Sequence, residues 1–219
     1  MFSFFKKNKV TINSISFPNF DWDKIENTEA EKKWINPEQS TLLSLSFFNI
    51  KPNLPTVKNL EFLKSFFRES ISAVNGGLVN VEIINLNTIP TVKTIFKVPQ
   101  EETGMIYLGS LIIPFEDYSF VIKIQSNEVG TTGLRDTVVL NELLEKEEIT
   151  FGEEGIENWF SDPYDVNFKK GTLMNKSDDE KYDNEFINHP LTIVRSLLNK
   201  IIQETTFNPE IESIARFDK

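Results

Sequence analysis

Hydrophobic and polar residues alternate at the two-residue period of β-strands in several stretches of the chain. Between Ser40 and Ile50, the side chains of Leu43, Leu45 and Phe47 share one face and serines occupy the other. Four further β-rich runs come later: Leu78–Asn87, Thr91–Val98, Met105–Pro114 and Tyr118–Asn127. Their connections of three to six residues suit hairpins and are too short for helical crossovers. The pattern predicts an antiparallel meander, with Met105–Pro114 central because it is apolar on both faces.

A helical period of apolar residues lies between these strands, from Val57 to Val74. Thr56 is its expected N-cap, and Asn75-Gly76-Gly77 supplies the left-handed residues that end a helix. We expect this helix to pack on the sheet through one shared core. The predicted members of that core are Phe67, Ile71, Leu111, Phe120 and Ile122.

Two more helices are predicted in the second half of the chain. The first begins near Thr131-Thr132-Gly133, where either threonine can cap it, and ends at about Lys146. The second extends from Pro190 to Gln203, because proline suits the first helical turn. Its expected inner stripe is Leu191, Val194, Leu198 and Ile201, with Arg195 and Lys200 outside. We expect the residues after it to fray.

A short helix is predicted before the first strand. Thr28-Glu29-Ala30-Glu31 has the form of a capping box, a hydroxyl followed three residues later by a carboxylate. Asn36-Pro37 would end the helix at once, because the residue before a proline avoids the helical region.

Composition excludes several classes of function. The chain has 219 residues, 33 acidic and 23 basic side chains, a net charge of −10, one histidine and no cysteine. The negative charge argues against nucleic acid as a partner. Without cysteine there is neither a disulfide framework nor a thiolate site. No apolar window is long enough for a membrane-spanning helix, and the order of apolar and charged residues in Met1–Lys9 is the reverse of a signal peptide. We therefore expect a cytoplasmic protein.

The negative charge is concentrated in residues 142–183, which hold 13 acids and five bases. This stretch also keeps aromatic and long apolar residues, which disordered tails lack. We interpret it as an ordered acidic arm, with Trp159 and Phe160 packed on the core and five acids facing solvent. These acids are the candidate partner-binding residues: Asp162, Asp165, Asp178, Asp179 and Glu180.

The sequence offers no catalytic, metal or cofactor signature. The acids of the arm lack the ligand spacing of an EF-hand, so solvated surface charge is the preferred interpretation. His189, the single imidazole, precedes Pro190, and we expect it to cap a helix or lie on the surface. The segment Glu128 to Asp136 contains two glycines before a helix, but no phosphate-binding motif. We expect a tight strand-to-helix turn, tethered by Arg135 and Asp136. No metal and no cofactor are predicted.

The order of elements resembles a known fold. A lead-in with Phe17-Pro18-Asn19-Phe20-Asp21-Trp22, then strand, helix, meander and helix, is similar to the Mog1/PsbP-like fold, which includes the DcrB-type bacterial proteins. The resemblance covers roughly residues 15–146. It implies a non-enzymatic module that binds other proteins, and it offers no catalytic residues.

Together these patterns predict one α+β unit. We expect an antiparallel sheet of about five strands flanked by helices in residues 1–146, and an acidic arm and last helix, residues 147–219, packed on it. The predicted function is a cytoplasmic, adaptor-like protein-binding module whose partner is another protein, with a basic partner left open. Two alternatives stay open: an immunity-type inhibitor of a basic toxin, and a small hydrolase or lyase that uses carboxylates alone.

Overall fold

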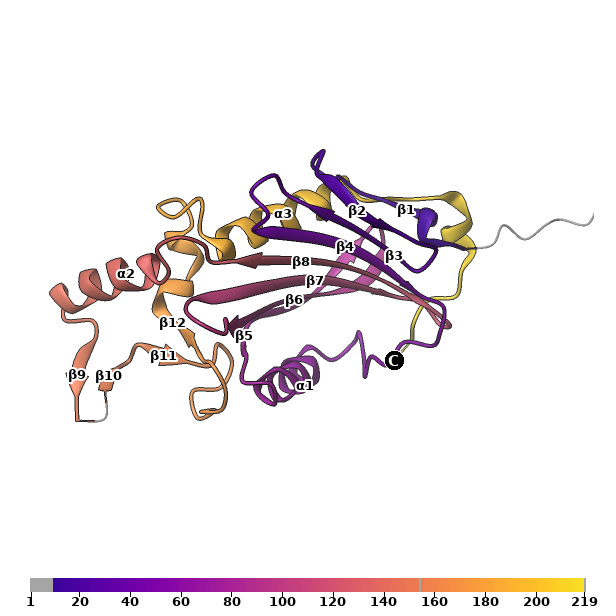
Figure 1. Cartoon of the computed structure of the whole chain (residues 1–219). Coiled ribbons are helices and arrows are strands. Elements are labelled where there is room, and N and C mark those ends of the chain that lie inside the picture. Colours follow the sequence, from indigo (N-terminus) through magenta and orange to yellow (C-terminus); the bar gives the residue numbers. More distant parts are fainter. Residues whose placement is uncertain (1–9, 154, 219) are drawn as a thin grey trace, which may run out of the picture.

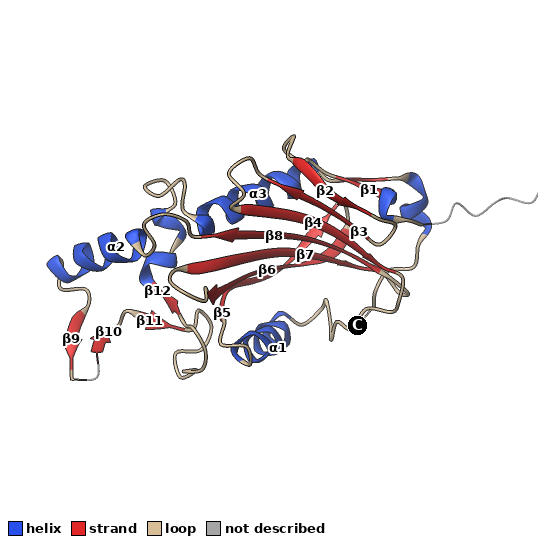
Figure 2. Ribbon diagram, in the orientation of Figure 1, coloured by secondary structure: helices blue, strands red, loops and turns tan. Residues whose placement is uncertain are grey.

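Seven antiparallel strands form one sheet at the centre of the computed structural model, which describes residues 10–153 and 155–218 (Figures 1 and 2). Their order across the sheet is β2-β3-β4-β8-β7-β6-β5. Their bounds are β2 (Asp23–Asn27), β3 (Glu31–Ile35), β4 (Thr41–Phe48), β5 (Gly77–Leu86), β6 (Ile89–Pro99), β7 (Met105–Pro114) and β8 (Ser119–Asn127). The α+β class, the predicted meander β5 to β8 and the interior place of β7 are confirmed.

The sheet has two more strands than the expected five, because the predicted short helix after Thr28 is wrong. The segment is a hairpin between β2 and β3. The Thr28 hydroxyl accepts hydrogen bonds from the backbone N–H groups of Ala30 and Glu31, as a helix cap would. The Glu31 carboxylate, however, lies against Lys33 on its own strand and Ser46 on β4. The same local motif therefore closes a turn, and pairing with β4 decides for a strand.

Helices cover both faces of the sheet. Helix α1 (Leu60–Ser72) packs on one face near β5, and α3 (Pro190–Glu204) packs on the other, across β7 and β8 (Figure 2). The prediction that these five residues share one core is therefore wrong. Phe67 and Ile71 pack on the α1 side of the sheet. The other three pack on the α3 side: Leu111, Phe120 and Ile122. Register pairs Leu111 with Ile122, which fixes them on one face.

Helix α3 approaches the sheet closely because β7 carries a glycine there. A Cβ on Gly109 would lie 2.5 Å from Val194 Cγ1 and 2.7 Å from Leu198 Cδ1. The predicted inner stripe of α3 is confirmed, since its four residues are fully buried. Arg195, which we expected outside, is buried as well, whereas Lys200 is exposed as predicted.

The ends of α1 and α2 (Leu134–Glu145) differ from the sequence prediction at their caps. Asn59, rather than Thr56, caps α1 with its side chain. Gly133 stands at the N-cap of α2 in the left-handed region, φ 70°, and no side chain caps this helix. Of the left-handed residues predicted after α1, Asn75 is confirmed, with φ 59°, whereas Gly76 and Gly77 have no positive φ and Gly77 begins β5.

The acidic arm wraps around the β5 edge of the sheet, at the end where α2 points away from it (Figure 1). It contains β9 (Thr150–Gly152), β10 (Gly155–Glu157), β11 (Phe160–Ser161), β12 (Met174–Asn175) and the 3-10 helices η2 (Lys176–Asp178) and η3 (Glu180–Tyr182). The backbone N–H of Val81, on β5, donates to the Tyr164 hydroxyl at 2.9 Å. The arm thus satisfies part of an edge that would otherwise be open to pairing.

The chain ends pack together rather than fray. Strand β1 (Ile15–Ser16) pairs with β13 (Thr206–Phe207), next to η1 (Ile12–Ser14) and η4 (Pro209–Ser213). Ile211 and Phe217 are buried, so the expected fraying after α3 is wrong. The segment Met1–Lys9 lies outside the described residues. No helix in the described parts of the chain has the length and apolarity to cross a membrane.

Candidate functional site

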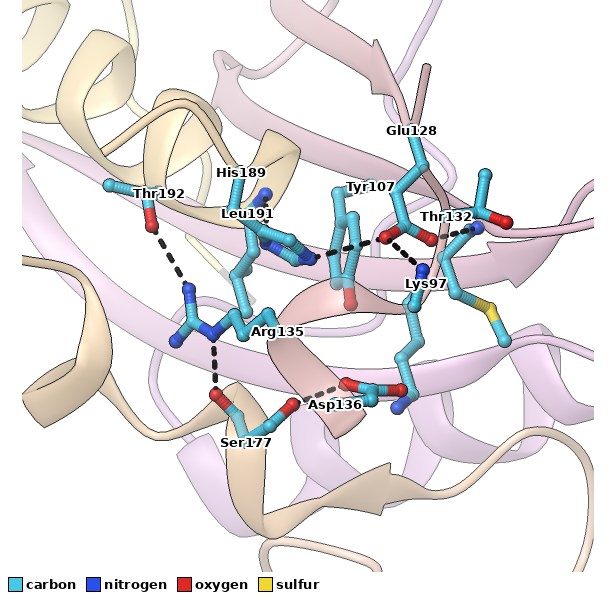
Figure 3. A network of polar contacts seen from close by, with 12 residues as sticks. Lys97, Tyr107, Glu128, Thr132, Arg135, Asp136, Ser177, His189, Leu191 and Thr192 are labelled. Carbon is cyan, nitrogen blue, oxygen red and sulfur yellow. Dashed lines mark hydrogen bonds and ion pairs between the residues drawn. The ribbon is translucent and has the colours of Figure 1, made fainter. Parts of the chain in front are cut away.

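A pocket of about 380 Å³ opens where β8 ends, between the N-termini of α2 and α3. The segment from Asn127 to Arg135 forms one side and the segment from Glu185 to Ile193 the other. The turn that the sequence singled out before α2 therefore borders this concavity. Figure 3 shows Glu128, Arg135 and His189 close together at this point.

Glu128 holds three elements together through its carboxylate. Its Oε1 accepts a hydrogen bond from the Gly133 backbone N–H at 3.0 Å, and its Oε2 accepts one from the Met105 N–H at 2.8 Å. The third neighbour is His189, whose Nε2 lies 3.6 Å from Oε1 (Figure 3). This glutamate therefore ties the start of β7 to the N-termini of α2 and α3, where an anion also suits the helix dipoles.

These contacts set the charge of Glu128. Burial raises the pKa of its carboxyl, but the nearby His189 ring and hydrogen bonds from the Gly133 and Met105 amides outweigh burial and hold the pKa below its ordinary value of 4.5. Glu128 is therefore ionised at neutral pH. A general acid needs the opposite shift.

His189 caps α3, as the sequence predicted. Its Nδ1 accepts a hydrogen bond from the Leu191 N–H at 3.3 Å, which leaves the proton of the neutral ring on Nε2, facing Glu128. The ring also lies edge-on to Tyr107, with centroids 5.3 Å apart. Both ring nitrogens are thus engaged with neighbours in the fold.

Arg135 tethers the turn, also as predicted, but it does so across the arm. The guanidinium is fully buried and donates to the backbone oxygens of Ser177 and Asp179. Its Nη1 reaches Asp183 at 2.9 Å and Thr192 at 3.0 Å, and Figure 3 shows the second of these contacts. The neighbouring Asp136 accepts hydrogen bonds from Ser177 and Asn175. Apart from the contact with Thr192 of α3, these tethers end in the segment that the sequence assigned to a displayed acidic surface.

Two of the five candidate partner-binding acids are buried, so the prediction that all five face solvent is wrong. Asp178 is wholly buried, paired with Lys97 and Tyr107. Asp162 is 4% exposed and accepts from the backbone N–H groups of Tyr164 and Asp165. Asp165 is partly exposed, and Asp179 and Glu180 are exposed. Binding of a partner by these last three stays a prediction.

The two predicted aromatic anchors of the arm, Trp159 and Phe160, differ in burial. Trp159 is buried against Val139 and Leu143 of α2, as predicted. Phe160 is 52% exposed, so its expected packing is wrong. Trp159 directly precedes the short strand β11, which begins at Phe160, and of the two residues only Trp159 belongs to the α2 cluster.

Sequence reasoning missed the role of Glu128 and the apolar ring around the pocket. Val129, Leu134 and Ile187 line its mouth, and each is more than half exposed. The available signal was a carboxylate directly after β8 and before the glycine turn. In the described residues, no three His, Cys, Asp or Glu side chains come together as metal ligands would.

No protein-family model matches the sequence, and no curated protein matches it. Solved structures do. The Ran-binding protein Mog1p of Saccharomyces cerevisiae is 8% identical over 89% of this chain and 90% of its own, with a TM-score of 0.44. The PsbP-like protein CyanoP of Synechocystis is 12% identical over 61% and 85% of the two chains, with a TM-score of 0.40.

A Bacteroides thetaiotaomicron structure is 15% identical, with a TM-score of 0.34. It is matched over 53% of this chain, and this chain spans 39% of its length. The neighbours include Mog1p and a PsbP-like protein, the two namesakes of the fold that the sequence pattern resembles, at low identity and low TM-score.

Proposed function

We propose that this protein is a non-enzymatic, adaptor-like module that binds another protein through the mouth of the pocket between α2 and α3. The observation that carries the proposal is the ring of exposed apolar side chains at that mouth: Val129, Leu134 and Ile187. Val138, one turn after Leu134, extends the ring along α2. Exposed apolar clusters with a polar surround are typical of protein interaction sites.

The polar groups of the pocket support binding rather than catalysis. Glu128 is kept ionised by backbone amides, and His189 is committed to a helix cap. A carboxylate-dependent hydrolase or lyase would need one carboxyl with a raised pKa. The pKa of Glu128 is lowered instead, which counts against this alternative.

The immunity-type alternative draws on the arm. A net charge of −10 and the exposed Asp179 and Glu180 would suit a basic toxin, because complementary charge speeds association. The acidic arm and the pocket share a tether at Arg135, so one basic partner could contact both surfaces. The absence of cysteine suits the reducing cytoplasm that we propose as the location.

Affinity capture with a matched pair of variants tests the proposal. The double variant Leu134→Ser/Ile187→Ser removes the apolar ring. Its control, Ile25→Ser/Val166→Ser, removes two apolar side chains of similar exposure elsewhere, since Ile25 is 56% and Val166 71% exposed against 53% and 67%. All baits must first show equal thermal midpoints.

A specific partner should be recovered with the wild type and the control and be lost with the ring variant. Equal recovery with both variants would place the interaction elsewhere and refute the proposed surface. Turnover of a small molecule by the wild type that is lost in Glu128→Gln would instead favour the enzyme.

A further inference from the structure

Two carboxylates line the pocket, and neither forms an ion pair with a lysine or arginine of the described residues. Glu128 lies at its inner end and Glu185 at its rim. Within the described chain, the carboxylate of Glu185 makes neither a hydrogen bond nor an ion pair, and the residue is exposed. Both groups can therefore act on whatever enters the pocket.

The fixed cation of the lining, Arg135, has its donors engaged away from the pocket. It shares the carboxylate of Asp183, which does not line the pocket, with Arg195, and it gives its other donors to the backbone of the arm and to Thr192. His189 is held with Nδ1 as the acceptor of the Leu191 N–H and with Nε2 turned toward Glu128. The pocket is thus electronegative although it lies between two helix N-termini.

Glu128 keeps acceptor capacity. A carboxylate has about four lone-pair positions, and backbone N–H groups occupy one on each oxygen. The histidine Nε2 is 3.6 Å away, longer than a good hydrogen bond. A further donor that enters from the pocket side can be accepted without breaking the contacts that hold the turn.

The walls suit a long aliphatic stem. Leu134, Phe186, Ile187 and Pro190 contribute apolar surface between the rim and the inner carboxylate. Small-molecule pockets begin at about 300 Å³, so a pocket of about 380 Å³ has room for one long side chain. Lysine and arginine place an apolar stem against such walls and a charged head beyond it.

We propose that the pocket receives a basic side chain, lysine or arginine, from the partner protein, with apolar neighbours of that residue resting on Val129, Leu134 and Ile187. The proposal rests on the proposed function and names the anchor chemistry of the same site. Interface hot spots cluster in pockets that desolvate the anchor residue, and arginine is one of the residue types enriched there.

Three capped pentapeptides test it: Ac-Ala-Leu-Lys-Leu-Ala-NH2, the same peptide with norleucine for lysine, and the same with glutamate. Binding to the full chain is followed by NMR shifts of Val129, Leu134 and Ile187 at about 50 mM salt. The lysine peptide should bind at least about tenfold tighter than the norleucine peptide, since a charged hydrogen bond is worth at least that factor. The glutamate peptide should be the weakest of the three.

Two variants locate the effect. Glu128→Gln should abolish the preference for lysine over norleucine. Because that change can disturb the turn, Glu185→Gln provides a second variant free of contacts within the described fold, and it should reduce the preference about threefold. Glu116→Gln, an exposed glutamate between β7 and β8 at the opposite end of β8, should leave the preference unchanged.

Equal affinity of the lysine and norleucine peptides, no shift up to 10 mM peptide, or shifts outside the pocket would each overturn the inference. Two results together would refute only the basic anchor: capture of a partner that needs Leu134 and Ile187, and equal affinity for the lysine and norleucine peptides. The proposed protein-binding function would then be retained. A lysine preference without any partner that needs the apolar ring would refute the protein-binding function and keep the pocket chemistry.

Discussion

Lys97 on β6 and Asp178 in η2 form an ion pair, with Nζ and Oδ2 2.6 Å apart and both side chains closed to solvent. Tyr107 donates to the other carboxylate oxygen at 2.9 Å, and the Asn175 N–H donates to Oδ2. The pair joins residues 81 positions apart in the sequence and fixes the arm to the face of the sheet on which Tyr107 and α3 lie.

Removing one partner of this pair should destabilise the protein strongly. Lys97→Met keeps the aliphatic stem but leaves the carboxylate of Asp178 buried without its cation. Such a change costs about 3–5 kcal/mol of unfolding free energy. Urea denaturation measures it, with Lys123→Met on an exposed position of β8 as the control. If Lys97→Met unfolds at the same urea midpoint as the wild type, the ion pair does not hold the arm.

Stability should fall in acid through Asp178 and Glu128. Burial opposes the ionised form of each, but Lys97 in one case and His189 with backbone amides in the other hold both pKa values below the ordinary 3.8 and 4.5. Lowered folded-state pKa values stabilise the fold above the ordinary values, and this stabilisation is lost as pH falls through the folded values. Urea midpoints between pH 6 and pH 3 should therefore drop less in Glu128→Gln than in the wild type. Parallel profiles would contradict this.

Adjacent phenylalanines on α1 provide a matched test of its buried face. Phe67 is buried between α1 and the sheet, whereas its neighbour Phe66 is 36% exposed. Phe67→Ala should cost about 3–5 kcal/mol, as aromatic truncations in cores do, and Phe66→Ala should cost clearly less. Chemical denaturation measures the loss of unfolding free energy in each variant. Equal losses would mean that the buried face of α1 is misassigned.

Trp159 should anchor the arm and Phe160 should not. Trp159→Ala opens the cluster with Val139 and Leu143, so proteases should cut residues 147–183 faster. Phe160→Ala, at a half-exposed position, should leave the cleavage rate near that of the wild type. Mass spectrometry of the fragments identifies the sites. Rapid cutting of the wild-type arm throughout would refute the anchoring altogether.

Association with a basic partner should depend on the exposed acids of the arm. Asp179→Asn/Glu180→Gln should slow association and leave the fold intact, because both residues are exposed. The wild-type rate should fall as salt exceeds about 0.15 M, where the Debye length is about 8 Å. Stopped-flow or surface-based kinetics with the captured partner measures both effects. A rate insensitive to salt would exclude the electrostatic role.

The local pattern of the sequence determined most of the secondary structure. The meander from β5 to β8 and the inner stripe of α3 follow from periods of two and 3.6 residues, which are properties of the chain itself. The cap at His189 and the left-handed Asn75 also follow, since both depend on neighbours within a few residues.

Tertiary structure decided what the local pattern leaves open. Thr28 offers its hydroxyl to the same backbone groups in a helix cap and in a hairpin turn, and pairing of β3 with β4 selects the hairpin. The sequence pattern predicts Arg195 and Asp178 to be surface charges. Both are buried, because residues distant in sequence pair with them. The pocket forms only where the end of β8 and the N-termini of α2 and α3 meet. Charge burial and concavity depend on which segments meet, and sequence spacing does not contain that information.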